Sequence, residues 1–306
     1  MPWYRGNTHT HTTASDGNVP TADAVRWYAT HGYDWLVITD HNHFGPTEPV
    51  ELELDRPFLT IPGSEISMRS EKLPVHLCAL NPRANPAYTS MPTIIQTLQA
   101  GVDRTRSLCG IPIINHPNWN WAFTDWHMAQ VSDWNLLEIF NASTDCNNFG
   151  AGGRPSVEDL WDSLLTRGMR VYAVAADDSH DFGVDYVGHV SPPGLGWVTV
   201  RAEELTTDAV LDALQRGDFY ASTEIVLAEY EVAADGEIRI RIEQKDSYAY
   251  TTTFIGAGGR VLSECYGTDA RYRLRGDEQY VRARIRSSNG GFGWTQPVFR
   301  GDVEVR

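Results

Sequence analysis

Cysteine is scarce in this 306-residue sequence, which contains four cysteines and no CxxC pair. Because the cysteines are widely separated, neither a zinc ribbon nor a disulfide framework is expected, and a reducing compartment fits their use. Long apolar runs are also missing. None approaches the ~20 residues of a membrane span, and the first residues show no apolar segment followed by a small-residue cleavage site. We therefore expect a cytoplasmic protein with no membrane partner.

Positively charged residues are also few. The sequence has 25 Lys and Arg and 40 Asp and Glu, which gives a formal net charge of −15. Duplex nucleic acid is held by clustered Lys and Arg, so we expect no binding to it. A localised basic pocket could still bind a small anion. Bound metal ions would neutralise part of the excess negative charge.

Three common catalytic motifs are absent: the GxSxG elbow, the Walker loop, and a GxGxxG after the first strand. Their absence disfavours acyl-serine, nucleoside-triphosphate and dinucleotide chemistry. The composition, 42% hydrophobic and 21% charged, is that of a globular protein. The length suffices for an α/β barrel of roughly 200–250 residues with a small appended unit.

Short apolar runs alternate with amphipathic stretches up to about residue 222, which is typical of parallel β/α units. The expected strands are 35–39, 76–80, 111–115, 136–140, 171–176 and 197–200. The expected helices, each closely followed by a glycine, are 21–30, 93–108, 156–167 and 207–216. Ser156 and Asp159 resemble a capping box at the third helix.

The pattern changes after about residue 224. Ile and Arg alternate in 237–242, and a similar alternation occupies 280–286, with Gly-rich turns between such segments. This is typical of antiparallel strands, so we expect a barrel in residues 1–223 and a small antiparallel β domain in residues 224–306. The arginine-rich faces could bind anions, but interleaved Glu and Asp favour a solvated sheet face.

His9 and His11 are the strongest local signal for chemistry, because residues two apart project to the same side of an extended chain. An HxH pair alone is weak, since histidines are also common in loops. Further candidate ligands lie near the ends of expected strands, and in a parallel barrel the carboxyl ends of the strands share one rim. They are Asp16, Asp40, His41, Glu65, His76, His116, Asp178 and His180. Burying all of them without metal would be costly.

These motifs together resemble the polymerase and histidinol phosphatase (PHP) superfamily. The segments that carry the resemblance are His9-Thr-His11, Ser15-Asp-Gly17, Thr39-Asp-His-Asn42, Gly63-Ser-Glu65, Asn115-His-Pro117 and Asp178-Ser-His180. Residues 138–141, 217–223 and 288–299 are similar to the branch grouped with carbaryl hydrolase, which includes carbamate and amide hydrolases. The resemblance implies a distorted (β/α)7 barrel that holds a trinuclear metal site.

The resemblance also implies which residues bind each ion. His9, His11, Glu65 and Asp178 would bind a first metal, and Glu65 would bridge to a second metal held by His76 and His116. Asp16, His41 and His180 would hold the third. Imidazole and carboxylate suit Zn, Mn or Fe, so two or three such ions per chain are expected, with a bridging hydroxide as nucleophile.

Two residues are expected to assist catalysis. Asp40 is interpreted as a carboxylate that orients a neighbouring imidazole, and His43, which has no ligand role, as the proton donor to the leaving group. A solvent-exposed loop residue is the alternative for His43. Asp177 stands where the family usually has a small residue. It could lie in the site or serve as an outward-facing cap.

Substrate contacts are less specific in the sequence. Arg154 could clamp a phosphate, Trp119 could wall the pocket, and Asn141 belongs to a family-like segment. Our first hypothesis is a phosphoesterase acting on a small anionic phosphomonoester or phosphodiester. The alternatives are a carbamate, amide or carboxylic ester hydrolase with the same metal centre, and a non-catalytic metal-binding module.

Overall fold

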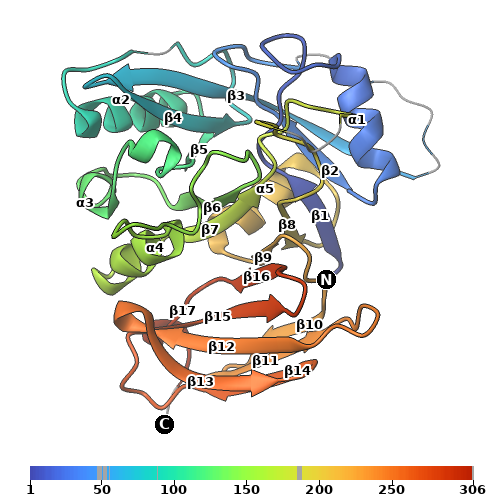
Figure 1. The fold of residues 1–306 in the computed structure, drawn as a ribbon, viewed down its shortest axis with the longest axis vertical. Coiled ribbons are helices and arrows are strands. Elements are labelled where there is room, and N and C mark those ends of the chain that lie inside the picture. Colours follow the sequence, from blue (N-terminus) through green and yellow to red (C-terminus); the bar gives the residue numbers. More distant parts are fainter. Residues whose placement is uncertain (47–49, 51–53, 55, 88, 185–187, 305–306) are drawn as a thin grey trace.

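The structure is a computed structural model that describes residues 1–46, 50, 54, 56–87, 89–184 and 188–304. Figure 1 shows that the molecule has two parts. The upper part contains strands and helices, and the lower part is rich in strands and contains the C-terminus. The upper part contains α1–α5 and the lower part contains strands from β10 onward. All site residues expected from the sequence lie in the described ranges.

The first part alternates short strands with helices. Its strands are β1 (Trp3–Asn7), β2 (Trp35–Ile38), β3 (Leu59–Ser70), β4 (Leu73–Leu80), β5 (Ile111–Ile114), β6 (Leu136–Asn141), β7 (Tyr172–Ala176), β8 (Trp197–Arg201) and β9 (Phe219–Ser222). Its helices are α1 (Thr21–Thr30), α2 (Ile94–Ser107), α3 (Asp125–Met128), α4 (Val157–Thr166) and α5 (Thr207–Arg216), with a 3-10 turn η1 (Trp119–Trp121). β2 and β5 are buried along their whole length, which explains their uninterrupted apolar sequences.

Helix ends follow the capping signals in the sequence. α1 and α5 have the expected bounds, whereas α2 and α4 are one residue shorter at each end because the terminal residues act as caps. Ser156 and Asp159 form the expected capping box, in which each side chain accepts a hydrogen bond from the other's backbone N–H. No helix in the described ranges has both the length and the apolar character needed to cross a membrane.

The parallel pattern expected from the sequence is interrupted at β4. β1, β2 and β3 are parallel neighbours, as are β5, β6 and β7, but β4 runs antiparallel to both β3 and β5. The cause is a two-residue turn at Glu71 and Lys72, whose φ angles of 53° and 69° suit a tight hairpin. Thr10 and Ser179, which follow β1 and β7, form an isolated parallel bridge. The first part is thus a mixed α/β structure.

The C-terminal part consists of antiparallel strands, as expected. They are β10 (Leu227–Val232), β11 (Glu237–Ile242), β12 (Tyr250–Gly256), β13 (Arg260–Tyr266), β14 (Asp269–Arg273), β15 (Tyr280–Ser287), β16 (Phe292–Thr295) and β17 (Val298–Phe299), with 3-10 turns η2 (Ala257–Gly259) and η3 (Arg300–Asp302). β16 pairs with β9, so one sheet path continues from the first part into β15, β12 and β13. β10, β11 and β14 form a separate sheet, and a second hydrophobic core lies among these strands.

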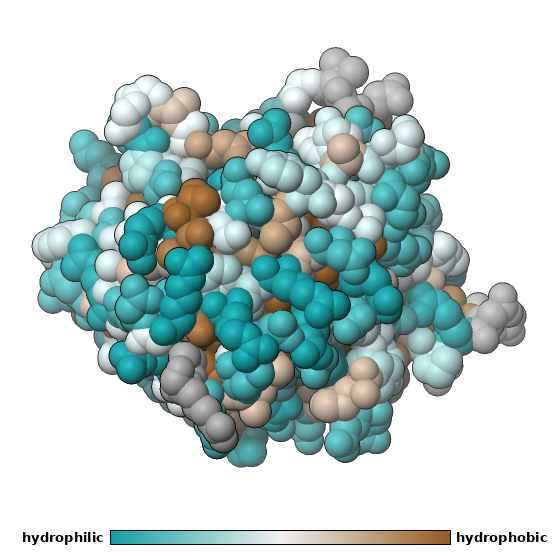
Figure 2. All heavy atoms as spheres, turned by 90° about the horizontal axis from the view of Figure 1, so that it is seen from below, coloured by the Kyte–Doolittle hydropathy of each residue, from teal (hydrophilic) through white to brown (hydrophobic). Residues whose placement is uncertain are grey.

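The outer face of the C-terminal strands is largely hydrophilic, as Figure 2 shows from below. The two arginines of β11 have carboxylate partners: Arg239 contacts Glu231 at 3.4 Å, and Arg241 contacts Glu229 at 3.2 Å. This pairing supports a solvated sheet face for β11 rather than an anion-binding surface.

A buried ion-pair network joins the two parts. Arg282 on β15 is fully buried, and its Nε and Nη2 donate to the two carboxylate oxygens of Asp162 on α4 at 2.7 and 2.6 Å. Its Nη1 lies 2.8 Å from Glu158 on the same helix. A buried carboxylate that loses its cation carries an uncompensated charge, so this network makes the contact between α4 and β15 specific.

We expect Arg282→Met to lower the free energy of unfolding by about 3–5 kcal/mol, because Asp162 would stay buried without its partner. Urea denaturation measures this. The control is Arg273→Met, which removes an exposed pair with Asp235 and should cost less than about 1 kcal/mol. Equal losses for the two variants would contradict the structural role given to Arg282.

Candidate metal centre

The two histidines that follow β1 converge on one carboxylate. His9 Nε2 lies 3.1 Å from Asp178 Oδ1, and His11 Nε2 lies 3.0 Å from the same oxygen. Asp178 follows β7 and has a φ of 51°, a left-handed conformation that a residue other than glycine adopts at a cost. The backbone at the end of β7 therefore turns in a way that presents Asp178 to both imidazoles.

Glu65, in the middle of β3, lies at the centre of the cluster. It is 1% exposed, and its two carboxylate oxygens lie within 3.5 Å of five imidazoles. The five contacts are His9 at 3.4 Å, His11 at 3.5 Å, His41 at 2.7 Å, His76 at 3.1 Å and His116 at 3.2 Å. No other carboxylate in the cluster has as many histidine contacts among the described residues.

A more exposed group lies beside this centre. Asp16 Oδ1 is 3.2 Å from His180 Nε2, and Asp16 Oδ2 is 3.5 Å from His41 Nε2. The loop that carries Asp16 folds tightly against the first histidines, because a Cβ atom on Gly17 would lie only 2.6 Å from the backbone of His11. A glycine at position 17 is therefore required for this approach.

All nine residues expected to bind metal are brought together. Ligand atoms close enough to share one ion occur in three groups: His9, His11 and Asp178; His41, Glu65 and His76; and His11, Asp16, His41 and His180. These groups differ in detail from the sets that the family resemblance implies. Glu65 groups with His41 and His76 instead of His9 and His11, and His116 is outside the three groups although it contacts Glu65.

The chemistry of the donor set fits divalent cations. Four buried atoms of the cluster have no hydrogen-bond partner in the part of the chain that the structure describes: His9 Nε2, His11 Nε2, Glu65 Oε2 and Asp178 Oδ1. A buried polar atom without a partner is costly, and these four are the atoms that face one another. Imidazole nitrogens and carboxylate oxygens that lack other partners are suitable ligands for Zn, Mn or Fe.

Electrostatic coupling keeps the carboxylates ionised. Burial alone would raise the pKa of Glu65 and of Asp178, but the surrounding imidazoles hold both pKa values well below the usual range. Burial and the charge of His180 lower the pKa of His11 to about 4, so this imidazole is neutral and able to bind a cation. Burial opposes charge on His41, but Glu65 and Asp16 raise its pKa to about 10.

Glu138, which had no expected role, and Asn141, which was expected to contact substrate, both position candidate ligands. Glu138, 2% exposed on β6, contacts His9 Nδ1 at 2.9 Å, and this contact leaves His9 Nε2 facing Asp178 and Glu65. Asn141, expected to contact substrate, instead donates to Glu138 at 2.9 Å and to Asp178 at 3.0 Å. Its amide is fully used by these carboxylates, so we revise its role to positioning Asp178.

The expected role of Asp40 is also corrected. Its buried carboxylate accepts hydrogen bonds from Thr12 N, Thr12 Oγ1 and Ser15 Oγ at 2.7–2.8 Å. Asp40 therefore holds the loop after His11 and reaches an imidazole only through Ser15, whose Oγ lies 3.3 Å from His11 Nδ1. Asp177, for which two interpretations were open, accepts backbone hydrogen bonds from residues 194–196 and one from Tyr28, and so supports a loop outside the cluster.

Two further residues do not reach the site. His43 is exposed, in agreement with its alternative as a loop residue, and it does not line the cavity beside the cluster. Arg154 is exposed too, with its guanidinium 4.8 Å from the centroid of the Trp121 ring. Arg154 does not line the cavity, and its side chain packs on Trp121, so the expected phosphate clamp stays a prediction.

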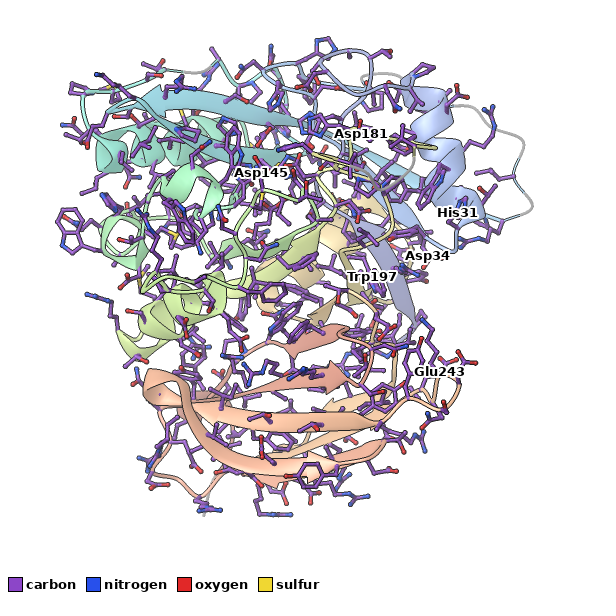
Figure 3. All side chains as sticks on the ribbon, in the orientation of Figure 1. His31, Asp34, Asp145, Asp181, Trp197 and Glu243 are labelled. Carbon is purple, nitrogen blue, oxygen red and sulfur yellow. The ribbon has the colours of Figure 1, made fainter. Side chains whose placement is uncertain are left out.

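A cavity of about 320 Å³ opens beside the cluster. Seven of the nine candidate ligands line it, together with Trp119, whose ring lies 5.2 Å from that of His76. The rest of the wall comes from the loops after β6 and β7, which contribute Asp145, Asp181 and His189. Figure 3 shows Asp145 and Asp181 in the upper part of the molecule, away from the C-terminal strands.

The strand arrangement and the clustered ligands define a mixed α/β protein with a candidate metal site near the ends of its strands. A two-domain protein from Bacteroides vulgatus, which contains a predicted PHP-like metal-dependent phosphoesterase, has the same fold. The similarity covers 97% of this chain and 95% of that chain, with a TM-score of 0.53 and 13% identity. At this identity the similarity concerns the fold alone.

Two other solved structures match with lower TM-scores. A putative metal-dependent phosphoesterase from Bifidobacterium adolescentis matches with 15% identity and a TM-score of 0.43, over 69% of this chain and 96% of that chain. An amidohydrolase from Chromobacterium violaceum, with bound sulfate and no metal, matches with 12% identity and a TM-score of 0.40, over 62% of this chain and 88% of that chain. No family model and no curated protein matches the sequence.

We expect Glu138→Gln to weaken metal binding by about 10–100-fold, because the amide no longer provides the negative charge that orients His9 and raises its basicity. Isothermal titration of the metal-free protein with Zn²⁺ or Mn²⁺ measures the change. Glu158→Gln, which alters a carboxylate on α4 outside the cluster, is the control. Unchanged affinity in Glu138→Gln would argue against a ligand role for His9.

Proposed function

We propose that the chain is a metal-dependent hydrolase. The observation that supports the proposal is a group of four buried atoms that face one another and have no hydrogen-bond partner among the described residues. They belong to His9, His11, Glu65 and Asp178. We further propose that nine residues hold two or three divalent ions: His9, His11, Asp16, His41, Glu65, His76, His116, Asp178 and His180. When bound, such ions supply Lewis acidity and activate water at neutral pH.

The protein's own side chains would hold the ligands in position and shield the reacting group from water. Glu138 and Asn141 hold His9 and Asp178 in place, and Asp40 fixes the loop that carries Asp16. Trp119 covers one side of the cavity and so limits the access of water to the reacting group. This arrangement orients substrate and ligands before the reaction begins.

A phosphoester is our first choice of substrate, because several cations in one cavity suit the charged oxygens of a phosphoryl group. One observation favours a carbamate or amide as the alternative. Among the residues that the structure describes, no Arg or Lys lines the cavity, while Trp119 offers an apolar surface. A neutral aryl substrate would need less positive charge from the protein.

We also propose the finer fold that the family resemblance implies. In this proposal β1–β7 and their helices are the distorted (β/α)7 barrel of residues 1–223, and residues 224–306 are a separate β domain. The parallel bridge between Thr10 and Ser179 supports a closed arrangement of these seven strands. The pairing of β9 with β16 crosses the proposed boundary and would fix the two units to each other.

A panel of p-nitrophenyl phosphate, bis-p-nitrophenyl phosphate and 1-naphthyl N-methylcarbamate, assayed with Mn²⁺ or Zn²⁺, tests the proposed reaction. We expect a phosphoester to be hydrolysed, and Asp178→Asn to lower the rate by at least about 10²-fold because a metal ligand is lost. Turnover of the carbamate alone would establish the alternative. If metal binds and none of the substrates is hydrolysed, the non-catalytic module becomes the better interpretation.

Metal removal provides a test that is independent of substrate. We expect a chelator to lower the melting temperature, and Zn²⁺ or Mn²⁺ to restore it, because an ion at about 100 times its Kd adds roughly 2.7 kcal/mol to stability. The His9→Ala variant should gain less on metal addition. Elemental analysis that finds fewer than two equivalents, with an unchanged melting temperature, would count against the proposed centre.

His189 replaces His43 as our proposed proton donor to the leaving group. It lines the cavity, it is not among the proposed ligands, and its Nε2 lies 2.8 Å from Asp145 Oδ2. Asp145 is itself fixed by Trp119 Nε1 at 2.6 Å and Ser143 Oγ at 3.0 Å. An imidazole held by an anchored carboxylate can keep one nitrogen free for proton transfer.

The His189→Ala variant should lose about 10²-fold in kcat on an alkyl phosphate, whose leaving group needs a proton. The loss should be small on p-nitrophenyl phosphate, whose leaving group departs as an anion. His31→Ala, which removes an exposed histidine stacked on Trp27, is the control and should leave both rates unchanged. Equal losses on the two substrates would show that His189 does not donate the proton.

A further inference from the structure

A second cavity, of about 260 Å³, lies where the first part meets the C-terminal strands. Its walls come from the end of β6, the loop after β6, the start of α4, and the paired strands β15 and β16. None of the nine proposed metal ligands lines it. The six residues that matter here are Phe140, Phe149, Arg284, Arg286, Phe292 and Trp294.

Aromatic rings make up one wall of this cavity. Phe292 and Trp294 lie two residues apart on β16 and so share one face of the strand. Their ring centroids are 5.6 Å apart, and the ring planes are inclined by 10°. Phe149, which is 61% exposed, lies 5.3 Å from Phe292, and Phe140 lies 6.3 Å from Trp294. A large exposed aromatic residue beside stacked rings offers a surface on which another flat ring can pack.

Cation-bearing side chains come from the neighbouring strand. On β15, Arg284 pairs with Trp294 and Arg286 with Phe292 across the strands, so guanidinium and aromatic groups share one face of the sheet. Arg284 lies 3.4 Å from Glu158, which also contacts Arg282. Arg286 has no carboxylate or hydrogen-bond partner for its side chain among the described residues.

The local charge therefore favours an anion. Three arginines, at 282, 284 and 286, stand against two carboxylates, Glu158 and Asp162, so this region carries a net charge of +1 in a chain of net charge −15. A further donor is without a partner: the indole Nε1 of Trp294, which is 2% exposed, donates to no acceptor in the described part of the chain. A buried N–H without an acceptor is costly unless a ligand supplies one.

We propose that this cavity binds a small molecule with a planar aromatic ring and one anionic group. The ring would pack against Phe149 and Phe292, and the anion would pair with Arg286. Guanidinium and aromatic groups together recognise this combination of charge and flat surface.

The site is distinct from the candidate metal centre. The loop between β6 and α4 separates the two cavities: Ser143, Asp145 and Cys146 line the metal cavity, whereas Asn148 and Phe149 line the aromatic one. A ligand in the second cavity would therefore not be the molecule that undergoes hydrolysis. The inference does not depend on the proposed reaction.

Binding of 2-naphthoate to the metal-loaded protein, measured by isothermal titration, tests the proposal. We expect saturable binding that is weakened about tenfold or more by Arg286→Gln and by Phe149→Leu. Both side chains are exposed, so the variants should remain folded. Arg241→Gln, which changes an exposed arginine on β11, is the matched control and should bind 2-naphthoate as the wild type does.

Probe chemistry and a metal-site variant distinguish the alternatives. The neutral 2-naphthamide and the non-aromatic cyclohexanecarboxylate should each bind about tenfold or more weakly than 2-naphthoate. Binding should persist in Asp178→Asn, whose change lies in the other cavity. The proposal is overturned if 2-naphthoate does not bind, if 2-naphthamide binds equally well, or if Arg286→Gln has no effect. Loss of binding in Asp178→Asn would assign the carboxylate to the metal centre instead.

Discussion

The buried carboxylate of Glu65 is the constraint on which the rest of the site depends. An ionised carboxylate at 1% exposure is unfavourable unless partners surround it, and here five imidazoles from β4 and three strand-end loops do so. Each imidazole must reach the middle of β3, which fixes where the neighbouring strands end. The strands β1, β2, β4 and β5 therefore have little freedom to shift relative to β3.

The reversed direction of β4 follows from the same constraint. β3 is long enough to continue past Glu65, and the tight turn at Glu71 and Lys72 returns the chain directly alongside it. His76 then lies across from Ser67, two residues beyond Glu65, and its Nδ1 reaches the carboxylate at 3.1 Å. A crossover helix would have placed the next strand parallel, with its amino end far from the cluster. The hairpin brings a residue from the first half of β4 to the ligand set.

The sequence predicted the parts of the structure that local chemistry specifies. Helix bounds followed from caps and glycines, and ordered motifs named the nine candidate ligands that the structure brings together. It could not predict the β3 to β4 hairpin, because Glu-Lys is not a typical turn pair. The roles of Glu138 and Asn141 depend on contacts between distant residues. The packing of Arg154 on Trp121 is likewise tertiary, and sequence position alone does not reveal it.

The C-terminal strands do more for this fold than cover its end. Because Trp294 on β16 packs against Phe140 on β6 and Arg282 on β15 pairs with Asp162 on α4, both ends of the segment from β6 to α4 contact these strands. The loop inside that segment carries Asp145 toward the metal cavity and Phe149 toward the aromatic cavity. Asn148 in this loop exchanges two hydrogen bonds with the backbone of Asn141, whose amide holds Asp178. The position of a proposed metal ligand thus depends on packing that begins in the C-terminal sheet.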